Sequence, residues 1–79
     1  MMGFFMEIKP DFSGLKENLP PIIPRSDIQR YLGNLFSPGY LENLDSAGRG
    51  PKRIRINKRI CYLREDFLSW LEARAEVLA

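Results

Sequence analysis

The sequence contains no histidine and only one cysteine, and each shortage excludes a class of chemistry. Histidine is the most frequent general base and a common zinc ligand. The lone cysteine, Cys61, has no base partner and cannot form an internal disulfide. The acids are scattered over expected helix starts and surfaces instead of being paired in a cleft. We therefore expect a protein that is not an enzyme, holds no metal or cofactor and takes no small-molecule substrate.

The sequence also lacks a long hydrophobic run. Its opening MMGFFMEI is too short to span a bilayer and has neither the basic flank nor the cleavage site of a secretory signal. Met6 is an alternative to Met1 as the initiator. We expect no membrane contact and, since no disulfide is needed, a cytoplasmic location.

The composition fits one small globular domain with a thin core. The chain has 79 residues, of which 44% are hydrophobic and 28% charged. The net charge is only +2, but seven of the twelve cations lie in residues 49–64, where no acid occurs. Residues 1–24 contain four of the six prolines and predict an N-terminal arm, with at most one helical turn near residues 11–18. Ile22 and Ile23 are expected to dock on the domain, which spans residues 25–79.

Residues 25–48 predict two short helices. In the first, Ser26 and Gln29 have the spacing of a capping box, and Gly33 supplies a left-handed stop. Its apolar positions at helical spacing are Ile28, Tyr31, Leu32 and Leu35.

The second helix begins with Ser37 as its cap and Pro38 at its first position, and Gly48 ends it. Leu41 and Leu44, with Gly48, mark its inward face. Two short helices joined by a tight turn form a helix-turn-helix arrangement.

The segment RIRINKRICYL alternates apolar and polar residues and predicts a hairpin. A two-residue turn would mix the faces, whereas a three-residue loop at residues 57–59 pairs Ile56 with Ile60 and Ile54 with Tyr62. We therefore expect the three-residue loop, with Arg59 in its left-handed position. The other face then presents Arg53, Arg55 and Cys61.

A last helix is predicted from residue 63, with Glu65 and Asp66 in its first turn, where they suit the helix dipole. Its apolar stripe is Leu63, Phe67, Trp70, Leu71 and Leu78. The predicted fold class is mainly α with a β-hairpin, in the order of a winged helix-turn-helix.

Four motifs occur at characteristic spacings. Ser37-Pro38 opens the second helix and GRGP leads into the hairpin, while Tyr62 ends the hairpin and D-x-x-x-W-L lies in the last helix. With these motifs, residues 25–74 resemble the small excisionase and AlpA-type regulators, whose domain is similar to the DNA-binding head of MerR-type regulators. The resemblance implies sequence-specific binding to double-stranded DNA. The second helix would enter the major groove, and the hairpin wing would lie on the backbone or minor groove.

The implied role is a transcriptional regulator or an excisionase-like accessory factor of recombination on a mobile element. A domain of this size covers only about 600 to 1,000 Å² of DNA, so a homodimer or a cooperative array is expected. One alternative stays open: a protein-protein interaction module whose basic wing binds an acidic partner. It is favoured by Glu42 and Asp45 in a second helix that has no cation.

Two sets of residues are expected to bind DNA. The wing set is expected to neutralise phosphate and comprises Arg49, Lys52, Arg53, Arg55, Lys58 and Arg59. The recognition-helix set comprises Ser37, Gly39, Tyr40, Glu42, Asn43 and Ser46. In the second set, Ser37 suits a phosphate, Asn43 an adenine edge and Glu42 cytosine N4. An ordinary polar helix face explains the second set equally well.

The remaining candidates have plainer interpretations. Trp70 and Tyr62 fall on apolar stripes and are expected in the core, and Cys61 is expected to be a small strand residue with no reactive role. Arg64 and Arg74 are assigned to solvated helix faces.

Overall fold

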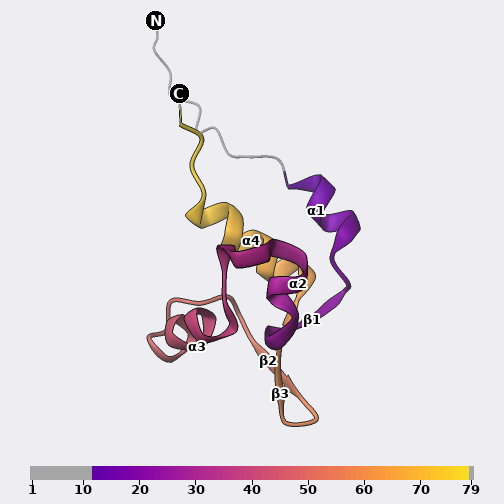
Figure 1. Cartoon of the computed structure of the whole chain (residues 1–79), viewed down its shortest axis with the longest axis vertical. Helices are drawn as coiled ribbons and strands as arrows, with labels where there is room; N and C mark the ends of the chain where they lie inside the picture. The colour runs from indigo at the N-terminus through magenta and orange to yellow at the C-terminus, as the bar shows by residue number, and fades with distance from the viewer. Residues whose placement is uncertain (1–11, 79) are drawn as a thin grey trace, which may run out of the picture.

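A computed structural model describes residues 12–78 and shows a mixed α/β fold. This part contains four α-helices and a three-stranded antiparallel sheet with strand order β1-β3-β2 (Figure 1). The elements are α1 (Ser13–Asn18), β1 (Ile22–Pro24), α2 (Ile28–Leu32), α3 (Pro38–Ser46), β2 (Ile54–Ile56), β3 (Arg59–Leu63) and α4 (Arg64–Arg74). Two 3₁₀ turns, η1 (Arg25–Asp27) and η2 (Gly33–Leu35), flank α2. The expected helices and hairpin are therefore present, together with one strand that was not predicted.

One core is shared by the sheet and the helices. Its buried apolar side chains are Leu19, Ile23, Ile28, Phe36, Leu41, Tyr62, Phe67 and Leu71. Each helix contributes few of these residues, so the short helices depend on packing against one another and on the sheet. Within residues 12–78, no helix combines the length and apolarity needed to cross a bilayer.

The unpredicted strand, β1, comes from the segment assigned to the arm. Ile23 lies opposite Tyr62 of β3, and both side chains are fully buried. The helical turn expected near residues 11–18 is α1, so that part of the prediction is confirmed. Pairing between residues almost forty positions apart gives no local sequence signal, which is why the strand was missed.

The start of α2 differs from its prediction. Ser26 lies inside η1, and no side chain caps α2, so the expected capping box does not form. Gly33 has a φ of +62° and ends the α-helix as predicted, but its ψ of −143° is not that of the expected left-handed stop. Leu35 was expected on the inward face but is 65% exposed, because the chain turns into η2 and the helical spacing no longer applies.

The ends of α3 follow the sequence closely. The Oγ of Ser37 accepts a hydrogen bond from the backbone N–H of Tyr40 at 3.1 Å, and proline follows at the first position. At the other end Gly48 has a φ of +73°, and the N–H of Arg49 donates to the carbonyl of Leu44 at 2.8 Å. This is a Schellman motif, and it turns the chain toward the hairpin.

The hairpin has a two-residue turn, so the predicted three-residue loop is wrong. Asn57 and Lys58 both have positive φ, 50° and 69°, and Ile56 lies opposite Arg59. Two left-handed residues make a type I′ turn, whose twist matches that of the strands. Asn tolerates this conformation well. The predicted loop followed from the alternation of apolar residues, whereas the preference for a type I′ turn decides the register of the hairpin.

This register also corrects the predicted faces. Ile54 pairs with Cys61, so both lie on the face opposite to Tyr62 and Ile60. Cys61 was expected beside the cations but is 4% exposed. Ile56 was expected to point inward but is 39% exposed, near the turn and on the same face as Ile54 and Cys61.

The last helix is shorter than its predicted stripe. Glu65 and Asp66 lie in its first turn, and Phe67 is fully buried, as expected. Leu63 is the last residue of β3 and is 40% exposed, and Leu78 lies beyond the helix and is 81% exposed. These two assignments are wrong because the helix begins only at Arg64 and already ends at Arg74, so that neither leucine belongs to it.

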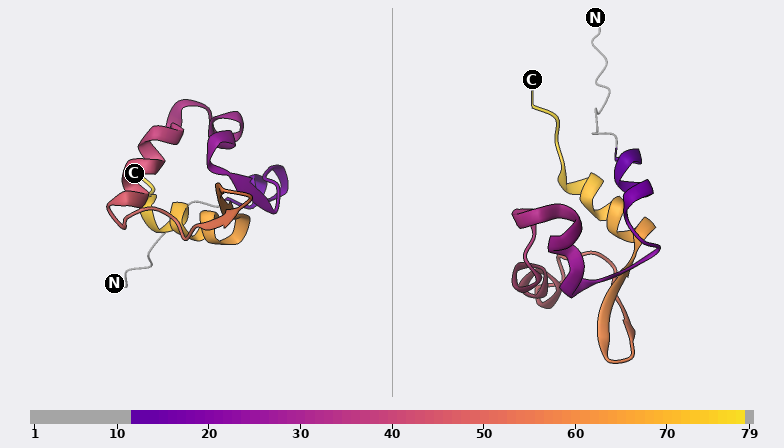
Figure 2. Two further views of the ribbon diagram at one scale, coloured as in Figure 1. Left: turned by 90° about the horizontal axis from the view of Figure 1, so that it is seen from below. Right: turned by 45° about the vertical axis from the view of Figure 1, so that its right-hand side comes forward.

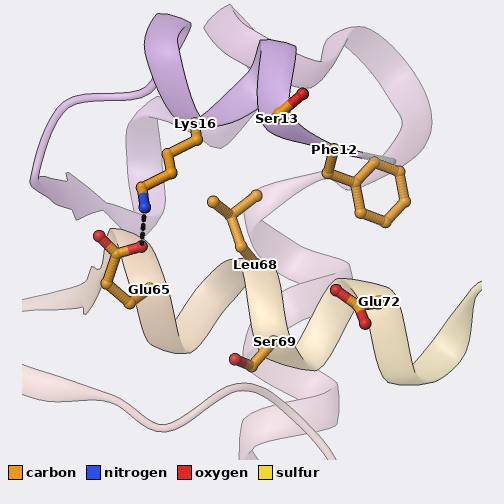
Figure 3. Close-up of a pocket in the computed structure, with 7 residues that line it drawn as sticks. All are labelled: Phe12, Ser13, Lys16, Glu65, Leu68, Ser69 and Glu72. Atoms are coloured by element: carbon orange, nitrogen blue, oxygen red, sulfur yellow. Dashed lines mark ion pairs between the residues drawn. The ribbon is translucent and has the colours of Figure 1, made fainter. Parts of the chain in front are cut away.

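α1 lies along α4, and side chains of both helices line an open pocket between them (Figure 3). Leu68 of α4 points toward α1, and Lys16 Nζ lies 3.8 Å from Glu65 Oε1. Both charged side chains are more than half exposed, so this ion pair contributes little to stability.

Candidate nucleic-acid interface

The chain from residue 49 to 59 contains six cations and no acid. All six are exposed: Arg49, Lys52, Arg53, Arg55, Lys58 and Arg59. Within residues 12–78, none of the six takes part in a salt bridge. We call this segment the basic hairpin. Its turn projects away from the helices, at the end of the molecule where α3 also lies (Figures 1 and 2).

The six cations are not equivalent. Lys58 lies at the tip of the turn, and Arg55 lies on β2, the outer strand of the hairpin. Arg53 is partly engaged, because its Nη1 donates to the backbone carbonyl of Asp45 at 3.2 Å. The base of the segment is fixed by the Trp70 Nε1–H, which donates to the carbonyl of Arg49 at 2.9 Å.

The exposed face of α3 contains most of the predicted recognition set. Gly39, Glu42, Asn43 and Ser46 are exposed. Ser37 is half-buried, and its Oγ is occupied as the helix cap.

Tyr40 differs from the others, because it is directed to α4. Its ring stacks on Phe36 with centroids 6.1 Å apart, and its hydroxyl accepts from Arg74 Nη2 at 3.3 Å. The guanidinium of Arg74 also lies 4.9 Å from the centre of the Trp70 ring. Tyr40 therefore helps to hold α3 against α4.

A groove joins the first turn of α3 to the basic hairpin. It is lined by Arg25, Ser26, Pro38, Gly39, Glu42, Arg59 and Ile60. Two predicted recognition residues, Gly39 and Glu42, thus share one surface with the hairpin cation Arg59. The sequence did not single out Arg25, which lines the same groove.

Beneath this groove lies a buried carboxylate. Asp45 was expected to add negative charge to the surface of α3, but it is 4% exposed. Its Oδ2 accepts from Arg25 Nη1 at 2.9 Å and from the Tyr62 hydroxyl at 2.7 Å. The helical spacing contained the signal, because a residue four positions after Leu41 lies on the same inward face.

The carboxylate changes the pKa values of both partners. Burial raises the pKa of Tyr62, and the hydrogen bond to Asp45 and its negative charge raise it further. Burial alone lowers the pKa of Arg25, but the hydrogen bond to Asp45 and the neighbouring charges outweigh this, so the pKa is raised. Arg25 therefore stays charged and Tyr62 stays neutral. The ion pair between Arg25 and Asp45 is thus supported by a neutral hydroxyl that donates to the same carboxylate oxygen.

Gly50 completes this arrangement. A Cβ at Gly50 would overlap Oδ1 of Asp45 and approach its backbone N to 3.2 Å. Only glycine lets the chain pass this close to the buried carboxylate on its way into the hairpin. The backbone at Gly50 thus meets α3 at Asp45, the same residue that the side chains of Arg25 and Tyr62 contact.

Comparison with protein-family models and with curated proteins finds no match for the chain. Within residues 12–78, no group of three or more Cys, Asp or Glu side chains is arranged to hold a metal ion. The groove and the basic hairpin are therefore the features of the described residues that bear on function.

The plainer assignments have mixed outcomes. Tyr62 is a core aromatic as expected, and Trp70 is half-buried in contact with Phe36 and Phe67. Arg64 was expected on a solvated face but is partly buried, since its Nη1 donates to the carbonyl of Leu19 at 3.2 Å. It connects the start of α4 to the chain before β1, so its assignment was wrong.

Proposed function

We propose that the chain binds double-stranded DNA as a small winged helix-turn-helix protein. The single observation that carries the proposal is the basic hairpin: six exposed cations with no acidic partner among residues 12–78. Cations crowded in this way repel one another, and a polyanion relieves that repulsion. The arrangement of α3 and the hairpin on one groove supports the same proposal.

The two parts of the interface have different tasks in this proposal. The basic hairpin neutralises phosphate, either along the backbone or at the edge of the minor groove. α3 enters the major groove with its exposed face, where Asn43 and Ser46 meet base edges. Space is open around Gly39, since a Cβ there would have nothing within 4 Å, so the backbone of α3 can approach DNA closely.

The proposed biological role is the one that the resemblance of the sequence motifs implies. We propose a transcriptional regulator or an excisionase-like accessory factor of recombination, located in the cytoplasm and without catalytic activity. A single copy covers about 600 to 1,000 Å² of DNA, so a homodimer or a cooperative array supplies the remaining specificity.

The alternative is an interaction module that uses the basic hairpin to bind an acidic protein. The sequence favoured this alternative through the two acids of α3, Glu42 and Asp45. Because Asp45 is buried and paired with Arg25, only Glu42 adds negative charge to the exposed face of α3. Only one of the two acids that favoured the interaction module is therefore available on the surface of α3.

A binding titration against random duplex DNA at two salt concentrations tests the proposal. If four to six phosphates are contacted, log affinity falls with log salt at a slope of about −4 to −5. Replacing Arg53, Arg55, Lys58 and Arg59 together by alanine should weaken binding to all sequences alike. Undetectable binding at low salt, or affinity that does not change with salt, would leave the interaction module as the better explanation.

A further inference from the structure

Glu42 is the one acid among the residues that line the groove between α3 and the basic hairpin. Its side chain is 65% exposed. A carboxylate on a surface that meets DNA is repelled by the phosphates, so it weakens general affinity. A nearby cation can compensate for this cost, and a carboxylate at this position points to a task other than general affinity.

The compensation comes from Arg25. Its Nη2 lies 3.5 Å from Glu42 Oε2, while its Nη1 donates to the buried Asp45 Oδ2 at 2.9 Å. The Arg25 side chain is only 19% exposed, so it is held from below by Asp45 and meets Glu42 from the groove floor. A guanidinium can hold two carboxylates at once because its donors form a rigid fork.

This contact is an ion pair that draws one oxygen of Glu42 toward Arg25, and the largely exposed carboxylate can still accept a hydrogen bond at the groove surface. In the major groove, a carboxylate pairs with an amino donor and is repelled by the acceptors of guanine and thymine. Adenine N6 is flanked by the acceptor N7, whereas cytosine N4 is the donor that Glu and Asp side chains recognise. The hydrogen-bonding chemistry of a carboxylate therefore favours cytosine.

We infer that Glu42 is a specificity-determining residue that accepts a hydrogen bond from N4 of a cytosine in the major groove. Arg25 is the positioning residue that orients it and offsets its charge. The inference rests on the proposed DNA-binding function, of which it names the preferred base. It also explains why the acid-bearing helix faces the same groove as Arg59.

The test selects bound sites from a random duplex library with the wild-type chain and with Glu42→Ala, Glu42→Gln and Glu72→Gln. Glu72 is a matched control, because it is an exposed acid on α4 outside this groove. The wild type should select a C·G pair at one position and bind it about 5- to 150-fold more tightly than the substituted site. Glu42→Ala should lose this preference while its affinity for random duplex stays the same or rises. Glu42→Gln should shift the preference toward adenine, and Glu72→Gln should change no preference.

A fourth variant, Arg25→Lys, tests the positioning role. It keeps the positive charge but cannot hold both carboxylates in the same way, so it should blur the cytosine preference more than it lowers general affinity. If the wild type binds DNA with the expected salt slope but Glu42→Ala keeps the same base preferences, the inference is overturned and DNA binding stands. If the wild type binds no duplex at low salt, the proposed function fails and the inference fails with it.

Discussion

The Tyr62 hydroxyl donates to the buried carboxylate of Asp45 at 2.7 Å and thereby joins β3 to α3. The same oxygen of Asp45 accepts from Arg25, and the backbone carbonyl of Asp45 accepts from Arg53. One residue of α3 thus contacts the segment before α2, the central strand and the start of the hairpin. These contacts fix the angle between α3 and the basic hairpin, on which the proposed interface depends.

Replacing Asp45 by alanine should therefore destabilise the fold. The substitution leaves the buried Tyr62 hydroxyl without its acceptor and leaves the Arg25 guanidinium with only the exposed Glu42 as a partner, which costs about 3 to 5 kcal/mol of unfolding free energy. Urea unfolding followed by circular dichroism measures the change. Glu72→Gln, which alters an exposed acid, should remain within about 0.5 kcal/mol of the wild type. Equal stability of the two variants would show that Asp45 is not the joining residue.

The raised pKa of Tyr62 predicts a dependence of stability on alkaline pH. Below about pH 10 the phenol is neutral in both the folded and the unfolded chain, so its stabilising contribution is complete. Above that pH the unfolded chain ionises first, and the contribution is lost as the pH rises toward the higher folded pKa.

Tyr62→Phe removes this titration and leaves the other tyrosines unchanged. Below about pH 10 the wild type should be more stable than Tyr62→Phe by about 1 to 3 kcal/mol. The difference should shrink by up to about 1.4 kcal/mol for each further pH unit. Urea unfolding of both proteins from pH 8 to pH 11 checks this. A difference that stays constant over the whole range would contradict the buried hydrogen bond.

Two glycines offer a paired test of the route into the hairpin. Gly50→Ala forces a methyl group against Asp45 Oδ1, which is fixed through its carboxylate, and should destabilise the fold by about 1 to 3 kcal/mol. Gly39→Ala meets nothing within 4 Å inside α3 and should stabilise it by about 0.5 to 1 kcal/mol. Thermal unfolding of both variants gives the comparison. If Gly50→Ala is as stable as the wild type, the loop does not pass this close to Asp45.

The features that were predicted correctly have local causes. α3 was placed from Ser37, Pro38 and Gly48, whose effects act within one turn of the helix. The features that were missed depend on residues far apart in sequence. β1 needs β3 as its partner, and Asp45 needs Arg25 and Tyr62, twenty and seventeen residues away. An acid on the inward face of a helix indicates a buried partner, but the sequence does not say which one.

The loop of the hairpin was predicted wrongly for a local reason, the conformation of its two turn residues. The contribution of this conformation to stability can be tested by substitution. Lys58 is a left-handed residue without the freedom of glycine, and this conformation costs about 1 to 2 kcal/mol. Lys58→Gly creates an Asn-Gly turn, the most favourable type I′ pair, and should raise the unfolding free energy by about 1 kcal/mol. It also removes the cation at the tip, so the salt slope of DNA binding should fall in magnitude by about 0.9.

Lys58→Ala separates the two effects, because it loses the same charge but keeps a side chain in the left-handed region. It should show the weaker DNA binding of Lys58→Gly without the gain in stability. Thermal unfolding and duplex titrations at several salt concentrations measure both quantities on the same three proteins. Equal stability of the glycine and alanine variants would show that residue 58 is not strained. An unchanged salt slope in both would show that the tip does not contact phosphate, and the anchoring role would then fall to the cations nearer the base of the hairpin.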